Sequence, residues 1–143
     1  MLLVHTYAGP SLVEGVGVFA AEPIAKGALI WRFEPTFDRL APAELMETGE
    51  PAVQEFLRKY AYPAAHAPGM LIVELDNGRL MNHSDEPNTD FSSPLGGYAL
   101  RDIAAGEELL CNYGEFAPEF ELLPSLAAAH SIGDVRPNGA AAE

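Results

Sequence analysis

The chain has 143 residues, 48% hydrophobic and 20% charged, which suits a single folded domain with a core. It carries 21 acidic residues against 8 lysines and arginines, a net charge of −13. This balance argues against nucleic-acid binding, because phosphate recognition needs cationic side chains. The charge fits a basic partner such as a lysine-rich peptide, although acidity also serves solubility.

The cysteine content and the N-terminal sequence indicate in which cellular compartment the protein is expected. A single cysteine, Cys111, excludes an intramolecular disulfide and a cysteine-based zinc cluster. The apolar run at the N-terminus stops after Val4 and no basic region precedes it, so it is too short for a signal peptide or a membrane span. We therefore expect a cytoplasmic protein that does not associate with a membrane.

Short apolar runs, punctuated by 12 prolines and 13 glycines, predict a mainly β fold with short helices. The first long apolar segment predicts a strand, a turn at Lys26–Gly27 and a second strand over 28–33 with both faces buried. Residues 98–114 repeat this pattern, with Ile103–Gly106 matching Ile24–Gly27 at an offset of 79. The repeat predicts a folded-over β architecture with approximate internal symmetry, unless I-A-x-G is only a common turn.

One segment has the pattern of an amphipathic helix. Pro51 suits its first turn, and apolar residues follow at the spacing of one helix face: Val53, Phe56, Leu57 and Tyr60. A shorter helix is expected over 41–47, a strand over 70–75, and a tight turn at Asp76–Gly78.

The composition becomes small and polar after Leu123. We therefore predict one domain over residues 1–123 and a largely flexible tail over residues 124–143.

Residues 81–88, MNHSDEPN, gather polar groups that could serve a metal or a hydrolase. His83 with Asp85 or Glu86 supplies two ligands, whereas zinc needs three or four, so no metal is expected. Ser84 lacks the G-x-S-x-G context of a serine nucleophile. Cys111 follows an apolar run without a neighbouring base, which favours an inert, buried thiol.

The Gly15–Gly17 segment lacks the third glycine and the following helix of a dinucleotide-binding loop. Two interpretations stay open on the residues alone. It is either a turn that needs glycine or a place where the backbone approaches a ligand closely.

Three motifs occur in order: G-x-G-V-F-A, L-D-N-G-R-L-M-N-H-S-x-x-P-N and I-A-A-G-E-E-L-x-x-N-Y-G. The ordered set resembles the SET domain family of protein-lysine methyltransferases, and the resemblance runs from about Glu14 to Phe120. It implies a SET-domain β-clip fold whose C-terminal segment threads under a loop as a pseudoknot. It also implies S-adenosylmethionine as cofactor, leaving as S-adenosylhomocysteine, and a substrate lysine that reaches it through a narrow channel.

The resemblance assigns the cofactor site to residues from three motifs: Gly15, Val16, Gly17, Asn82, His83, Tyr113 and Phe116. The backbone of the glycine segment contacts the methionine part of the cofactor, while Asn82 and His83 hold its amino group and its adenine edge. Tyr113 faces the transferring methyl. An aromatic residue, Phe116 or Phe120, covers the adenine.

Two positions depart from the family pattern. Asn112 stands where the family commonly has aspartate, and Asp85 follows N-H-S where cysteine is common. The cysteine-rich zinc modules of larger members are absent. These departures put the choice of target in doubt more than catalytic competence.

The channel for the substrate lysine has four candidate residues: Tyr60, Tyr62, Phe91 and Cys111. Tyr60 and Tyr62 would share a face in an extended segment, although a plain core role fits them equally. Cys111 would share the face of Tyr113 on a strand. A small thiol there leaves room for a di- or trimethylated product, or for water.

Methyl transfer from a sulfonium to an amine needs no nucleophilic side chain and no metal, which agrees with the lack of a nucleophile–base pair. Burial beside a cationic sulfonium disfavours the substrate ammonium, so no general base is expected. The implied partner is a lysine-containing, basic protein or peptide, and a second copy of the chain could complete the groove. A catalytically weak binding module for basic segments and a small-molecule amine methyltransferase remain alternatives.

Overall fold

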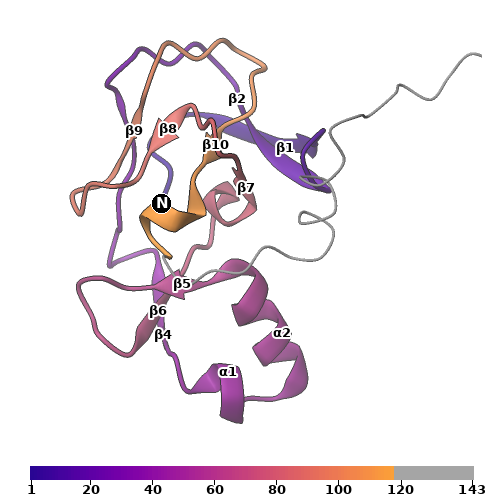
Figure 1. The fold of residues 1–143 in the computed structure, drawn as a ribbon, viewed down its shortest axis with the longest axis vertical. Coiled ribbons are helices and arrows are strands. Elements are labelled where there is room, and N and C mark those ends of the chain that lie inside the picture. The colour runs from indigo at the N-terminus through magenta and orange to yellow at the C-terminus, as the bar shows by residue number, and fades with distance from the viewer. Residues whose placement is uncertain (118–143) are drawn as a thin grey trace, which may run out of the picture.

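The computed structural model describes residues 1–117 (Figure 1). Short strands dominate, with two short α-helices and two 3₁₀ turns, which confirms the mainly β prediction. In chain order the elements are β1 (Thr6–Pro10), β2 (Val16–Ala20), β3 (Leu29–Trp31), β4 (Arg39–Pro42), α1 (Leu45–Thr48), α2 (Pro51–Tyr60), β5 (Tyr62–Pro63), β6 (Met70–Val73), η1 (Asn77–Leu80), β7 (Asn82–His83), β8 (Thr89–Asp90), β9 (Gly97–Ala99), β10 (Leu110–Cys111) and η2 (Tyr113–Glu115). Phe120 and the predicted tail lie outside the described residues.

The strands form four small sheets. β1 and β2 make an antiparallel hairpin, and β3, β9 and β8 form a second antiparallel sheet. β4, β6 and β5 form a third sheet below it, next to the helices (Figure 1). The fourth sheet is the parallel pair β7–β10, which joins two of the predicted motifs.

The predicted internal symmetry is confirmed by paired hydrogen bonds between the two repeats. Ile24 and Ile103 exchange backbone N–H···O bonds of 2.9 Å in both directions. The turn glycines mirror one another: Gly27 N–H donates to Ala99 and Gly106 N–H donates to Ala20, both at 2.8 Å. The strands on either side of each turn pair with the other repeat rather than with one another, so the units are not hairpins.

The core lies between the two repeats, where the largest fully buried side chains are Val18, Ile30, Thr89, Ile103 and Leu109. The second strand of the first repeat is shorter than predicted, because β3 covers only Leu29–Trp31. Ile30 and Trp31 are nevertheless buried, as the apolar run indicated.

The helices sit at one end of the molecule (Figure 1). α2 begins at Pro51 in the first turn, as predicted, and α1 packs against it. Only Leu57 of its apolar face is buried, while Val53 and Phe56 are each 41% exposed. The predicted tight turn at Asp76 instead opens η1, where the Asp76 carboxylate accepts from Gly78 N–H at 2.9 Å.

The loop after β7 forms hydrogen bonds with the segment that leads into β10. Asn88, 2% exposed, donates through Nδ2 to Glu108 O at 2.7 Å and accepts from Leu110 N–H at 2.8 Å. Thr89 Oγ1 donates to Leu110 O at 2.8 Å. These bonds hold the C-terminal motif against the N-H-S motif, the juxtaposition that the family resemblance implied.

Candidate active site

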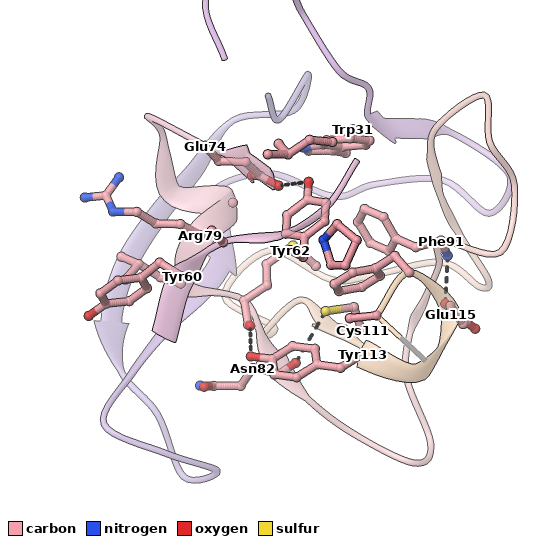
Figure 2. Close-up of a pocket in the computed structure, with 18 of the residues that line it drawn as sticks. Trp31, Tyr60, Tyr62, Glu74, Arg79, Asn82, Phe91, Cys111, Tyr113 and Glu115 are labelled. Carbon is pink, nitrogen blue, oxygen red and sulfur yellow. Dashed lines mark hydrogen bonds between the residues drawn. The ribbon is translucent and has the colours of Figure 1, made fainter. Parts of the chain in front are cut away.

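A pocket of ≈ 880 Å³ lies where both repeats, the end of α2 and the β7–β10 pair meet (Figure 2). It brings together nine residues predicted from the sequence: Gly15, Val16, Tyr60, Tyr62, Asn82, Phe91, Cys111, Tyr113 and Phe116. Gly17 and His83 are not among the residues that line it. A pocket of this size is typical of small-molecule and cofactor sites.

Asn82 is the polar anchor of the pocket and is 7% exposed. Its Nδ2 donates to Glu14 O at 3.1 Å, to Val16 O at 3.3 Å and to Glu108 Oε1 at 3.0 Å. The amide thus fixes the glycine segment with its donor side. Within residues 1–117 no donor bonds Asn82 Oδ1, so this oxygen is left to accept from a ligand.

Gly17 has a different surrounding from the one predicted. A Cβ at this position would lie 2.0 Å from Glu108 Oε1 and 3.1 Å from the Ser11 Cβ. Ser11 Oγ in turn donates to Glu108 Oε2 at 3.0 Å. Glycine is needed here so that the Glu108 carboxylate can reach Asn82; a direct contact of Gly17 with the cofactor stays a prediction.

Gly17→Ala is expected to displace Glu108 and weaken the Asn82–Glu108 hydrogen bond. The melting temperature should fall by several degrees, which corresponds to about 1–2 kcal/mol of overpacking strain. Gly9→Ala is the matched control: Gly9 pairs with Gly17 across β1–β2, and its added Cβ would meet only ordinary contacts at 3.4 Å or more. Equal thermal shifts for the two variants would contradict this role.

The His83 side chain is buried and contacts neighbouring residues of the fold. Its Nδ1 accepts from Tyr113 N–H at 3.2 Å, and its Nε2 lies 3.3 Å from Asp85 Oδ1. The imidazole also packs against the Tyr113 ring, with centroids 5.3 Å apart. His83 therefore orients Tyr113, and its predicted bonds to the cofactor stay a prediction.

Tyr113 has its hydroxyl fixed in the pocket. The hydroxyl donates to Met81 O at 2.7 Å (Figure 2). Burial raises the pKa of the Tyr113 phenol, so it stays protonated and neutral at physiological pH. Because the proton is committed to Met81, the oxygen lone pairs are directed toward the pocket.

Aromatic rings form the inner wall, and we call Trp31, Tyr62, Phe91 and Phe116 the aromatic cluster. Phe116 meets Tyr62 and Phe91 edge to face, with centroids 4.9 and 5.6 Å apart, and lies 5.8 Å from Tyr113. Trp31 packs against Tyr62 and Phe91. Phe116 is thus a wall of the pocket, and its predicted cover of the adenine stays a prediction.

Tyr60 and Tyr62 do not share one extended face. Tyr60 is the last residue of α2 and stacks on Phe56 at 5.0 Å, whereas Tyr62 begins β5 inside the aromatic cluster. Both still line the pocket. Tyr60 thus belongs to the helix, as the apolar spacing of this segment predicted, and not to an extended segment with Tyr62.

Cys111 lines the pocket as a buried thiol whose Sγ contacts Asn82 O at 3.8 Å. The thiol is buried, as predicted, and burial raises its pKa well above its ordinary range. β10 ends at Cys111, and Tyr113 lies in η2. The two side chains therefore reach the same pocket through a bend rather than along one strand face.

Sequence reasoning missed several residues of the pocket that carry polar or charged groups. Glu74, at the end of the apolar strand β6, and Trp31 both line its inner end, and Arg79 lies near its mouth. Arg58, Lys59 and Arg79 place three cations around one pocket of a strongly acidic chain. Two features of the sequence could have indicated these residues. Glu74 directly follows an apolar run, and Arg58 and Lys59 directly precede Tyr60.

Glu74 is the most perturbed acid that lines the pocket. It is 5% exposed, and Tyr62 Oη donates to its Oε1 at 2.5 Å. Burial raises the pKa of Glu74 to about 7, partly opposed by the Tyr62 hydrogen bond. The same burial, with the Glu74 charge, raises the pKa of Tyr62 well above its ordinary range.

Two searches for other kinds of site gave negative results within residues 1–117. No group of three or more histidine, cysteine or acidic side chains is placed to hold a metal ion there. No helix in that part of the chain is long and apolar enough to cross a membrane.

Residues 15–114 match the family model of the SET domain, and this chain belongs to that family. A search of curated proteins gave no match. Among solved structures, a humanized mutant of Chaetomium thermophilum Polycomb Repressive Complex 2 is similar at 25% identity and a TM-score of 0.57, over 81% of this chain. This chain spans 16% of the matched Chaetomium chain.

A putative histone methyltransferase of Plasmodium falciparum is similar at 24% identity and a TM-score of 0.54. The match covers 79% of this chain and 96% of the Plasmodium chain, so the two chains have the same fold over most of their lengths. The predicted SET fold is thereby confirmed.

The residues present fit the family's cofactor, S-adenosylmethionine. Asn82 Oδ1 offers an acceptor for its ammonium beside the carbonyl-rich glycine segment, and the aromatic cluster offers ring faces for a cationic sulfonium. The pocket volume exceeds what the cofactor alone needs, which leaves space for a second group.

Proposed function

We propose that this protein is an S-adenosylmethionine-dependent methyltransferase that modifies the side-chain amine of lysine in a basic protein or peptide. The observation that carries the proposal is the Tyr113 hydroxyl, fixed by Met81 O in a pocket shared with Asn82 and walled by aromatic rings. Its membership in the SET domain family supports the reaction class. The description of the Plasmodium neighbour as a putative histone methyltransferase supports a protein substrate.

The bound cofactor supplies an electrophilic methyl on a sulfonium. Asn82 and the glycine segment position that group, while His83 holds the Tyr113 backbone so that its oxygen faces the methyl. Tyr113 and nearby carbonyl oxygens stabilise the polarised methyl through weak C–H···O contacts. The aromatic cluster excludes water from the path of the amine.

Product choice follows from the space around the amine. Cys111 and Phe91 both line the pocket, and neither carries a hydroxyl that would hold a water molecule on the amine. We propose that the room beside the small thiol allows di- and trimethylation. A product restricted to monomethyl-lysine would contradict this assignment.

The net charge of −13 supports a basic substrate segment, for which the acidic surface favours rapid encounter. The two alternatives make different predictions. A binding module without turnover would retain affinity for basic peptides but transfer no methyl, and a small-molecule enzyme would methylate free amines in preference to peptides.

Asn82→Ala is expected to weaken cofactor affinity by about tenfold or more, because it removes an oriented acceptor and frees the glycine segment. Isothermal calorimetry with S-adenosylhomocysteine measures the change. Asn77→Ala, at a site outside the pocket, is the control. An affinity equal to that of the wild type would exclude Asn82 from the cofactor site.

The test of the function is incubation of the protein with methyl-labelled S-adenosylmethionine and a panel of basic proteins, including histones, followed by mass spectrometry of modified sites. Methyl groups on lysine side chains support the proposal. If no protein of the panel is labelled but free amines are, the small-molecule alternative replaces the proposed function. If neither proteins nor free amines are labelled and the cofactor still binds, the binding module without turnover is the remaining alternative.

A further inference from the structure

Glu74 is a buried carboxylate that the methyl-transfer scheme above does not use. Its Oε1 accepts from Tyr62 Oη at 2.5 Å, and its buried Oε2 has no hydrogen-bond partner in the structure of residues 1–117. Its side chain fits only because Gly78 lacks a Cβ, which would lie within bonding distance of Oε2. No lysine, arginine or histidine forms an ion pair with it in that region.

A second unpaired polar atom, Trp31 Nε1, belongs to the same end of the pocket. Figure 2 shows Trp31 and Glu74 at the opposite end of the view from Asn82 and Tyr113. Buried polar groups without partners are rare in folded proteins, and two that line one pocket indicate a place for a polar ligand group or an ordered water.

The ring contacts connect this end of the pocket to the reaction centre. Glu74 accepts a hydrogen bond from Tyr62 (Figure 2). The Tyr62 ring lies 4.9 Å from the Phe116 ring, which lies 5.8 Å from the Tyr113 ring. Phe116 thus lies between Tyr62 and Tyr113, and a ligand amine that reaches past Phe116 meets the Tyr62–Glu74 pair. Aromatic faces beside the unpaired Glu74 carboxylate favour a cation at this end of the pocket, and a cation is the ordinary state of a lysine amine.

We propose that Tyr62 and Glu74 form a proton relay that removes the proton of the substrate ammonium before methyl transfer. This inference rests on the proposed function and adds a base that the sequence did not lead us to expect. An ammonium N–H passes its proton to Tyr62 Oη as the Tyr62 hydroxyl proton passes to Glu74 Oε1. Tyr62 ends neutral, Glu74 ends as the neutral acid, and the amine gains its lone pair.

The lone pair then forms the N–C bond with the methyl of the sulfonium donor, and the C–S bond breaks with its electrons on sulfur. The product amine carries the positive charge, and Glu74 returns its proton to solvent through the pocket. The raised pKa of Tyr62 keeps its hydroxyl protonated, as a relay requires. The pKa of Glu74 near 7 makes it a proton acceptor matched to neutral pH.

The charged and titratable groups that face Glu74 come from several segments: Tyr62, Cys111, Asp76, Asp38 and the Met1 ammonium. Asp76 and Asp38 oppose ionisation of Glu74, and the Met1 ammonium favours it. Burial raises the pKa of the Cys111 thiol well above its ordinary range, so this group stays neutral beside Glu74.

The test compares Glu74→Gln and Tyr62→Phe with the wild type, using S-adenosylmethionine and the protein most rapidly methylated in the panel above. At pH 8 each variant is expected to lose about 100-fold or more in kcat/KM, the scale of lost acid–base assistance. The wild-type rate should level off above pH 7. The Glu74→Gln rate should keep rising tenfold per pH unit toward the pKa of free lysine, about 10.4.

Glu55→Gln, on the exposed face of α2, is the matched control and should leave rate and pH profile unchanged. Calorimetry with S-adenosylhomocysteine checks that each variant is folded and binds cofactor. If Glu74→Gln does not fold, Tyr62→Phe, which retains the ring, decides the question alone.

Wild-type rates in both variants would overturn the relay and leave an ordered water as the partner of Glu74. A lower rate with an unchanged pH profile would overturn it as well, since that is the signature of a structural role. A wild type that methylates no protein contradicts the proposed function instead, so the two failures are distinguishable. Carboxyl NMR gives a readout independent of turnover: one glutamate should titrate near pH 7 and be missing in Glu74→Gln.

Discussion

Tyr113→Phe is expected to lower kcat by about 100-fold or more while cofactor affinity remains that of the wild type. The ring keeps its contacts with His83 and Phe116, and the backbone N–H keeps its bond to His83 Nδ1. What is lost is the oxygen held by Met81 O at the reaction centre. The loss therefore falls on the transition state, and single-turnover rates with calorimetry of cofactor binding measure the two quantities separately.

Tyr7→Phe is a suitable control for this variant, because Tyr7 is half exposed on β1 and does not line the pocket. It should leave kcat unchanged. Near-normal turnover of Tyr113→Phe would remove Tyr113 from the reaction centre. A parallel loss of cofactor affinity would instead place its hydroxyl in the binding of the ground state.

Sequence reasoning was most successful where a motif fixes the backbone. The I-A-x-G repeat predicted symmetry, and the structure shows why: Gly27 and Gly106 adopt φ of +79° and +81°, and each turn donates to the opposite repeat. The N-H-S and N-Y-G motifs were expected to meet, and the parallel β7–β10 pair with Asn88 brings them together. In these cases a local requirement determines a long-range contact.

The inner half of the pocket could not be read from the sequence. Trp31 lies on β3, Tyr62 on β5 and Glu74 directly after β6, and these strands pair with other segments, so no local spacing relates the three residues. Gly17 was assigned to the cofactor from the family resemblance, and the sequence pattern does not show that the Glu108 carboxylate lies beside this glycine. A shared face for Tyr60 and Tyr62 required an extended segment, whereas Tyr60 ends α2 and Tyr62 begins β5.

The free energy of unfolding should reveal Glu74 independently of catalysis. Its pKa is raised from 4.5 to about 7 by burial, so between these values the folded protein holds a proton that the unfolded chain has lost. The folded state then binds more protons, and stability falls as pH rises through this window and is level above it. A shift of this size corresponds to about 3 kcal/mol.

Glu74→Gln removes the titration but keeps an oxygen for Tyr62, so its stability relative to the wild type should grow by about 2–3 kcal/mol between pH 5 and pH 8. Urea unfolding of both proteins at each pH measures the difference, in which all other titrating groups cancel. Glu55→Gln should show no such change, and a pH-independent difference for Glu74→Gln would contradict the raised pKa. A substitution that stabilises the fold and slows the reaction would show that the carboxylate is retained for chemistry, since its burial opposes folding at the pH where it acts.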